Sequence, residues 1–401
     1  MEKVYYFDNN ATSRVAPEVA REMEPFWGEL YGNPSSMHFF GGGNQKYLDL
    51  GRERVAKLLG CEPSEVIFTS CGTESDSTAL WSAVRAFPEK KHLITTAVEH
   101  PAVLNVCKYL ETQGYRVTYL PVDKTGQINL EDLKVALTPE TAIVSIMWAN
   151  NETGVVYPVE EAARITHAKG ALFHTDAVQA AGKAAIGLKD TKIDMLSISG
   201  HKLHAPKGIG VLYVKKGARF SPFMMGGHQE HGRRAGTENV PYIAGLGKAA
   251  ELAQANIEKE NTYVKGLRDR LEEGLLKIPN TRVNGGGAAR LPNTTNISFE
   301  YVEGESILLM LSEKGICASS GSACTSGSLE PSHVLMAMEV PQTYAHGSVR
   351  FSLSVYNTAE EVDYIIRELP PIIERLRAIS PFADGKPLFG MDACEPHTHK
   401  H

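Results

Sequence analysis

Short runs of polar side chains follow five segments of the sequence that have the composition of buried β-strands. Apolar residues fill most of each segment, and the polar run begins where the segment ends. In an open parallel sheet, ligands bind at the carboxyl ends of the strands. The five runs therefore predict a single binding site at one edge of a sheet. They are 71–74 after strand 66–70, Glu99 and His100 after 92–98, 150–152 after 142–149, Thr175, Asp176 and Gln179 at the end of 171–176, and 200–202 after 193–199.

Three of these residues have the chemistry of a pyridoxal phosphate site. Lys202, between two histidines in SGHKLHAPKG, could form a Schiff base if it is shielded from water, or could simply extend its ammonium into solvent. Asp176, one expected strand earlier, could keep a pyridine nitrogen protonated, which makes the ring an electron sink. His100 could lie over such a ring as an acid or base, or could be a structural histidine.

The stretch SCGTESDS, residues 70–77, could supply the phosphate-binding part of the same site. It places hydroxyls and small residues at an expected strand-to-helix turn, where backbone N–H groups and the positive helix end attract a phosphate. A plain helix cap is the alternative interpretation. Neither a Walker motif nor a GxGxxG turn is present, so the combination favours pyridoxal phosphate over a nucleotide.

One cysteine lies in a stretch that is unusual for this residue type. Cysteine is most often buried, yet Cys324 lies in SSGSACTSGS, whose composition is typical of a loop. We interpret this thiol as either incidental or a reactive group. The six cysteines form no CxxC pair, so we expect neither a disulfide framework nor a structural zinc site. They are Cys61, Cys71, Cys107, Cys317, Cys324 and Cys394.

The elements that must position these residues alternate between helix-like and strand-like segments from about residue 50. Repeated β–α units with nearly continuous apolar strands predict an α/β fold with a mainly parallel sheet covered on both faces. A long charged helix, two short strands and a final helix follow, which predicts a smaller α+β domain. We divide the chain into an N-terminal segment packing with the small domain, a large domain, a small domain carrying a mobile cysteine loop (about 317–330) and a disordered tail. These parts are 1–15, 16–257, 258–380 and 381–401.

Composition limits the classes of function. The chain has 401 residues, 42% of them hydrophobic, and a net charge of −6 without a basic block, so we expect no nucleic-acid partner. No apolar run reaches the roughly 18 residues of a membrane span, and the start lacks the pattern of a secretory leader. We therefore expect a cytoplasmic protein. Cys394 and the histidines of the tail could bind a metal, but a solvated end is the favoured interpretation.

At this point several stretches together resemble the pyridoxal-phosphate-dependent cysteine desulfurases of class V. The resemblance covers residues 4–380, in order. Within this family, the stretches are most similar to the nitrogen-fixation type and its close relatives in iron–sulfur cluster assembly. It implies an aspartate-aminotransferase-like fold (fold type I) and a homodimer. The stretches are YFDNNATSRVAPEV, YGNPSSMHFFG, FTSCGTESDS, AVEHPAV, ANNETG, HTDAVQAAGK, SISGHKLHAPKG, GGHQEHGRRAGTEN, SSGSACTSGSLEPSH and GSVRFSLS.

The resemblance also implies a role for each matching residue. Lys202 would hold the cofactor covalently, Asp176 would contact its pyridine nitrogen, Gln179 its hydroxyl, and His100 would stack on the ring. Cys324 would accept sulfur from L-cysteine, pass it to an iron–sulfur scaffold protein, and could transiently ligate a cluster; no metal is expected in the active site itself. The remaining roles are Gly72, Thr73, Ser199 and His201 at the phosphate, Thr237 at the phosphate of the partner subunit, and Asn151 and Arg350 at the substrate carboxylate.

Arg350 also suits its role on its own chemistry, because a guanidinium can bind a carboxylate through two hydrogen bonds. An outward-facing strand residue is the alternative for this arginine. For the whole chain, the alternatives are another class V enzyme, such as an aminotransferase or a selenocysteine lyase, the desulfurase group with a shorter cysteine loop, or a scaffold protein. The sequence favours a desulfurase, since an aminotransferase has no need of Cys324.

Overall fold

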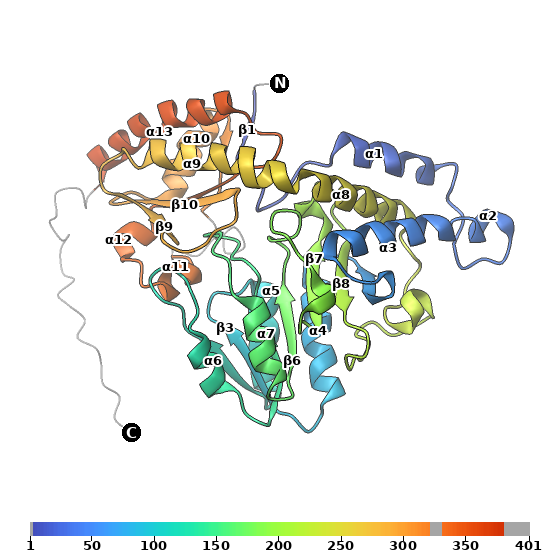
Figure 1. Ribbon diagram of the computed structural model, residues 1–401. Coiled ribbons are helices and arrows are strands. Elements are labelled where there is room, and N and C mark those ends of the chain that lie inside the picture. Colours follow the sequence, from blue (N-terminus) through green and yellow to red (C-terminus); the bar gives the residue numbers. More distant parts are fainter. Residues whose placement is uncertain (1–2, 321–330, 381–401) are drawn as a thin grey trace.

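The computed structural model describes residues 3–320 and 331–380 (Figure 1). Its largest sheet has seven strands, and four of the six neighbouring pairs are parallel. The strand β8 runs antiparallel to both of its neighbours. In spatial order the strands are β2 (Val66–Thr69), β8 (Gly210–Val214), β7 (Met195–Ser199), β6 (Leu172–Asp176), β5 (Thr141–Ser145), β3 (His92–Thr96) and β4 (Arg116–Leu120).

Helices cover both faces of this sheet, as the nearly continuous apolar strands predict. Successive strand residues point to opposite faces, so Ile67 and Phe68 of β2 belong to two different hydrophobic clusters. The cluster with Ile67 lies against α4 and α5, and that with Phe68 lies against α3, α7 and α8. The helices of this part are α1 (Pro17–Met23), α2 (Phe39–Gly42), α3 (Gln45–Leu59), α4 (Gly72–Ala86), α5 (Pro101–Thr112), α6 (Leu130–Ala136), α7 (Val159–His167) and α8 (Val240–Lys259).

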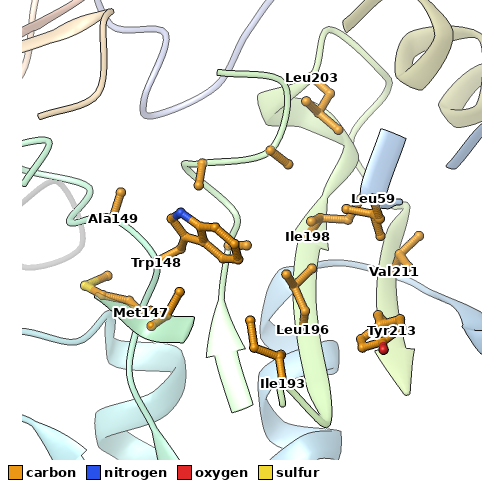
Figure 2. Packing of buried hydrophobic residues seen from close by; sticks show 14 of the residues in the cluster. Leu59, Met147, Trp148, Ala149, Ile193, Leu196, Ile198, Leu203, Val211 and Tyr213 are labelled. Carbon is orange, nitrogen blue, oxygen red and sulfur yellow. The ribbon is translucent and has the colours of Figure 1, made fainter. Parts of the chain in front are cut away.

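Figure 2 shows part of the second cluster beside β7 and β8. Leu196 and Ile198 of β7 lie next to Val211 and Tyr213 of β8, and all four are at most 1% exposed. Leu59, the last residue of α3, belongs to the same cluster and lies near Ile198 and Val211. The strands that end at the site are therefore held in a well-packed core.

A second unit contains a three-stranded antiparallel sheet with its own hydrophobic core. Three helices pack on it and gather at one end of the molecule in Figure 1. The main elements are β9 (Thr281–Asn284), β10 (Thr294–Phe299), β12 (Ser348–Ser352), α9 (Lys265–Leu275), α10 (Gly304–Glu313) and α13 (Ala359–Ile379). Two shorter helices, α11 (His333–Ala337) and α12 (Gln342–Ala345), lie between α10 and β12 in the sequence.

The N-terminal segment contacts both units. Its strand β1 (Tyr5–Tyr6) pairs in parallel with β11 (Ile316–Cys317), and Phe7 belongs to the core of the second unit. A few residues later, the backbone N–H of Ser13 donates to the carbonyl of His201, next to Lys202. The segment therefore connects the second unit to the edge of the large sheet.

The two units are also joined by one continuous helical segment. The helix α8 runs directly into a π-helical turn, η6 (Glu260–Val264), and then into α9. The domain boundary expected between 257 and 258 falls within this segment. Short 3₁₀ turns complete the described chain: η1 (Glu24–Trp27), η2 (Pro63–Glu65), η3 (Leu188–Asp190), η4 (Gly200–Lys202) and η5 (Gln229–Gly232).

The five expected strands that lead to the site extend one to four residues beyond the observed ones, and the difference is largest for 142–149. The strand predicted over 142–149 ends at Ser145 as β5, although the chain stays buried through Ala149. The following backbone still donates to the neighbouring strand, from Ile146 to the carbonyl of His174 and from Trp148 to the carbonyl of Asp176. Along residues 3–320 and 331–380, no helix is both long and apolar enough to cross a membrane.

Candidate active site

A cavity of about 1000 Å³ lies where the carboxyl ends of the large sheet meet the second unit. Thr237 lies outside it, on a separate cavity of about 190 Å³, and Cys324 lies outside the described residues. The structure thus brings residues of all five strand-end runs to one cavity, although Glu74, Glu99, Asn150, Thr175 and Gly200 do not line it. The residues with an expected role that line the large cavity are Gly72, Thr73, His100, Asn151, Asp176, Gln179, Ser199, His201, Lys202 and Arg350.

Lys202 lies in the turn η4, directly after β7. Its Nζ donates a hydrogen bond to the carbonyl of Ala11 (2.8 Å) and another to the carbonyl of Asn10. Burial, together with the positive charges of Arg350 and Lys183, lowers the pKa of Lys202 to about 7. A large fraction of this amine is therefore unprotonated near neutral pH, which is the form that attacks a carbonyl carbon.

Asp176 is the last residue of β6, and its carboxylate reaches the cavity. Its Oδ1 accepts a hydrogen bond from the backbone N–H of Val178 at 2.8 Å. Burial raises the pKa of Asp176 to about 6, although this hydrogen bond and the charge of Lys202 act in the opposite direction. A cationic ligand group beside Asp176 would favour its ionised form.

His100 caps the N-terminus of α5. Its Nδ1 accepts a hydrogen bond from the backbone N–H of Ala102 at 3.1 Å, so the ring proton of the neutral side chain lies on Nε2. Burial lowers the pKa of His100 to about 4, and the charges of Lys202 and His333 add to this effect. His100 is therefore a neutral imidazole that can donate from Nε2.

The phosphate-binding stretch expected at 70–77 begins the helix α4. Cys71 is the N-cap and Gly72 is the first helical residue. A Cβ atom at Gly72 would lie 2.9 Å from a methyl group of Val178, so only glycine fits there. The first N–H groups of a helix lack intrahelical acceptors, and here they belong to residues that line the cavity.

Arg350 is the third residue of β12 and is buried. Its Nη1 donates to the carbonyl of Asn151 (3.0 Å), and its Nη2 donates to Oδ1 of Asp8 (2.7 Å). Its Nε is buried and has no hydrogen-bond partner among the described residues. The side chain faces the cavity rather than solvent, which excludes the outward-facing alternative.

Asn10 is a central residue of the site that the sequence analysis did not assign. Its carbonyl accepts from Nε2 of Gln179 at 3.1 Å, in addition to Lys202. Its side chain donates to the carbonyl of Asn151 (3.1 Å) and to Oγ1 of Thr294 (2.9 Å). The signal was present, because Asn10 belongs to a polar run that follows a short apolar segment, as at the five other strand ends.

A buried polar cluster lies beside Asp176. His174 of β6 is fully buried, with Nδ1 2.8 Å from Oγ of Ser145 and Nε2 2.9 Å from Oγ of Ser197. Asp76 of α4 lies 3.6 Å from the same Nε2, and its Oδ1 has no hydrogen-bond partner among the described residues. Burial raises the pKa of Asp76 well above its usual value, and the charge of Asp176 adds to this effect.

The neutral form of His174 makes a testable contribution to stability. Burial lowers its pKa to about 3 in the folded chain, so only the unfolded chain takes up this proton as the pH falls below about 6.5. A His174→Gln variant cannot take up this proton. The difference in unfolding free energy between the unaltered chain and the variant should therefore decrease by about 2 kcal/mol from pH 7.5 to pH 5.

Denaturant unfolding at the two pH values measures this change. The exposed His228, substituted by Gln in the same way, is the control. A difference that stays constant with pH would show that His174 is not held in its neutral form.

The residues of the cavity fit pyridoxal phosphate. Lys202 offers an amine for the aldehyde, Asp176 a carboxylate for the pyridine nitrogen, and α4 its N-terminus for the phosphate. The buried Oε1 of Gln179 has no hydrogen-bond partner among the described residues, and a ring hydroxyl would supply the missing donor. Fold and cavity together define a pyridoxal-phosphate-dependent enzyme of fold type I.

Comparison with known proteins narrows this class. The family model described as Aminotransferase class-V matches residues 5–365, so the chain belongs to the class-V aminotransferase family, whose members depend on pyridoxal phosphate. This agrees with the resemblance found in the sequence and confirms the predicted fold class and cofactor. No cluster of His, Cys, Asp and Glu that could hold a metal ion is found along the described ranges.

Close relatives share nearly the whole chain. A protein of Trichormus azollae named cysteine desulfurase is 61% identical over 384 residues, which are 96% of each chain. A protein of Azotobacter vinelandii named cysteine desulfurase NifS is 59% identical over 95% of each chain. A solved structure named NifS-like protein is 41% identical and superposes with a TM-score of 0.88, covering 93% of this chain and all of the other.

Proposed function

We propose that this chain is a cysteine desulfurase, which converts L-cysteine to L-alanine and retains the sulfur as a persulfide on Cys324. The observation that carries this proposal is that one cavity is lined by both Lys202 and the buried Arg350. The amine of Lys202 has a pKa near neutrality. Chemistry at the Cα atom of an amino acid needs a base that removes the Cα proton and a cation that binds the carboxylate. The amine and the guanidinium are these two groups. The names of the relatives support cysteine as the amino acid.

The residues proposed to hold the cofactor follow from the cavity. Lys202 would bind its aldehyde carbon, Asp176 its pyridine nitrogen and Gln179 its ring hydroxyl, with His100 against the ring. The phosphate would lie at the N-terminus of α4 with Gly72, Thr73, Ser199 and His201. When bound, pyridoxal phosphate supplies an electron sink for the electron pair that remains when a proton leaves the substrate Cα atom.

The side chains of the cavity would carry out the proton transfers. Arg350 and Asn151 bind the substrate carboxylate, which orients the Cα–H bond. The unprotonated amine of Lys202 then takes the Cα proton, because burial has already lowered its pKa to about 7. His100 would offer its Nε2–H as the donor to the ligand, since its Nδ1 accepts a hydrogen bond from the backbone N–H of Ala102.

Sulfur transfer is assigned to Cys324. Its thiolate attacks the substrate sulfur, and the bond between Cβ and sulfur breaks. The electron pair of that bond passes to the substrate carbon skeleton, where Cβ takes up a proton to become the methyl group of alanine, and the sulfur stays on Cys324 as a persulfide. The described residues on both sides of 321–330 support this assignment. Ser319 exchanges backbone hydrogen bonds with Arg350 (3.2 and 2.6 Å), and Ser332 donates to Oε2 of Glu152, which lines the cavity.

The same proposal includes the oligomeric state, the sulfur acceptor and the cellular location. The resemblance puts Thr237 at the phosphate of the partner subunit, and its position outside the large cavity of its own chain supports a homodimer. The exposed apolar side chains of Trp27, Tyr31 and Phe39 also support one. An iron–sulfur scaffold protein would receive the sulfur, in nitrogenase or in general cluster assembly. We also propose that the protein is cytoplasmic.

Product analysis tests the proposed reaction. The protein, loaded with pyridoxal phosphate and given L-cysteine and dithiothreitol but no keto acid, should form L-alanine and sulfide in equal amounts over many turnovers. Dithiothreitol supplies the two electrons that release the persulfide sulfur. An aminotransferase would stop after a single half-reaction, because it needs a keto acid to regenerate its cofactor. Alanine without sulfide, or no turnover, would contradict the proposal.

A further inference from the structure

The guanidinium of Arg350 already has a carboxylate partner from its own chain. Nη2 donates to Oδ1 of Asp8 at 2.7 Å, and the Arg350 side chain is only 3% exposed. Among the described residues, no other carboxylate lies within ion-pair distance of this guanidinium. A buried cation needs such a counter-charge, because removing it from water is costly.

The backbone fixes this pair on both sides. Arg350 lies in the middle of β12, where it pairs with Asn296 of β10. Asp8 forms an isolated parallel bridge with Ser352, two residues further along β12. The two side chains therefore come from adjacent backbone segments, the strand β12 and the segment that bridges to it at Asp8.

The contacts leave one nitrogen of the guanidinium without any acceptor among the described residues. Asp8 engages Nη2 and the carbonyl of Asn151 engages Nη1, whereas the buried Nε has no partner among the described residues. A buried donor without an acceptor is costly, so the arrangement favours an incoming oxygen at Nε. The substrate carboxylate would then lie near Asp8, and two like charges that share one cation repel each other.

We propose that Asp8 is a positioning residue for substrate binding. It holds the guanidinium of Arg350 so that Nε is presented to the substrate carboxylate, and its own negative charge limits the affinity of the site for that carboxylate. This inference rests on the proposed function, in which Arg350 binds the carboxylate. Asp8 thus has two separable effects on the ligand: its oxygen orients the arginine and favours binding, and its charge opposes binding.

Two variants of Asp8 separate these effects. Asp8→Asn keeps an oxygen acceptor for Nη2 but removes the charge, so the dissociation constant of L-alanine should fall by about tenfold. Asp8→Ala removes both, so the guanidinium is no longer oriented and the dissociation constant should rise by about tenfold. Isothermal titration calorimetry of the cofactor-loaded protein with L-alanine measures both values. The KM for L-cysteine should change in the same directions, and kcat should change less.

Two further variants make the result unambiguous. Asp363→Asn breaks an exposed ion pair with Arg270, and since neither residue lines the cavity, it should leave alanine binding unchanged. Arg350→Ala tests the function on which the inference rests, since it should weaken alanine binding strongly. If Arg350→Ala weakens binding but both Asp8 variants bind alanine like the unaltered chain, or both weaken it equally, the positioning role is overturned. If Arg350→Ala has no effect, the assignment of the carboxylate site itself fails.

Discussion

Replacing Lys202 with alanine is expected to lower sulfide release from L-cysteine by about four orders of magnitude or more. Lys202 is the side chain proposed both to bind the cofactor aldehyde and to take the Cα proton. Its partners in the resting chain are two carbonyl groups, of Asn10 and Ala11, which can bind water in the variant. The loss should therefore arise from chemistry, and the melting temperature should stay close to that of the unaltered chain.

The measurement combines a sulfide assay with absorbance. The unaltered chain should keep a visible cofactor band after gel filtration, and the variant should lose it, because its cofactor is no longer covalently bound. Lys207→Ala is a matched control on the same segment, since Lys207 is exposed and does not line the large cavity. A Lys202→Ala protein that retains the band and turns over cysteine would contradict the assignment.

Replacing Cys324 with alanine is expected to lower sulfide release by about three orders of magnitude, with cofactor binding intact. The substrate sulfur would have no thiolate to accept it, although Lys202, Asp176 and Arg350 are unchanged. The visible band should persist and should still respond to added L-cysteine. Quantifying persulfide by mass spectrometry after one turnover should show it on Cys324 in the unaltered chain and nowhere in the variant.

A second cysteine makes this experiment decisive. Cys71 is the only cysteine of the described residues that lines the large cavity, where it caps α4. Cys71→Ala should keep most of the activity, because our assignment gives the sulfur to Cys324. Full activity in Cys324→Ala together with loss in Cys71→Ala would reverse that assignment and identify a thiol within the cavity as the acceptor.

The parallel part of the fold could be predicted from the sequence. Nearly continuous apolar strands alternate with helices there, and this pattern is typical of a parallel sheet covered on both faces. The same pattern could not indicate strand direction, and β8 proved to be antiparallel to β2 and β7. A continuous apolar run looks alike in either orientation. The expected strand over 142–149 was too long because Ile146 and Trp148 are buried and hydrogen-bonded to β6, although the regular strand ends at Ser145.

The strand-end residues of the site could be predicted because local sequence places them. Asp176 and Lys202 each follow their own strand, and topology then brings the strand ends together. Asn10 also follows a short apolar segment, so the same local reasoning could have found it. The pairing of Asp8 could not be predicted in this way. Asp8 contacts Arg350 across 342 positions of the sequence, and no local pattern indicates a pairing of that range.

The position of this N-terminal segment has a consequence for how the protein is made. Asp8 leaves the ribosome 342 residues before Arg350, and the rest of β12 is made at about the same time as Arg350. The arginine end of the cavity cannot be completed until β12 has been synthesised, and such distant pairings form slowly. A nascent chain could already contain Lys202 and Asp176, yet it would lack the guanidinium that we propose binds the substrate carboxylate. The proposed carboxylate site is thus completed later in synthesis than the residues proposed to bind the cofactor ring.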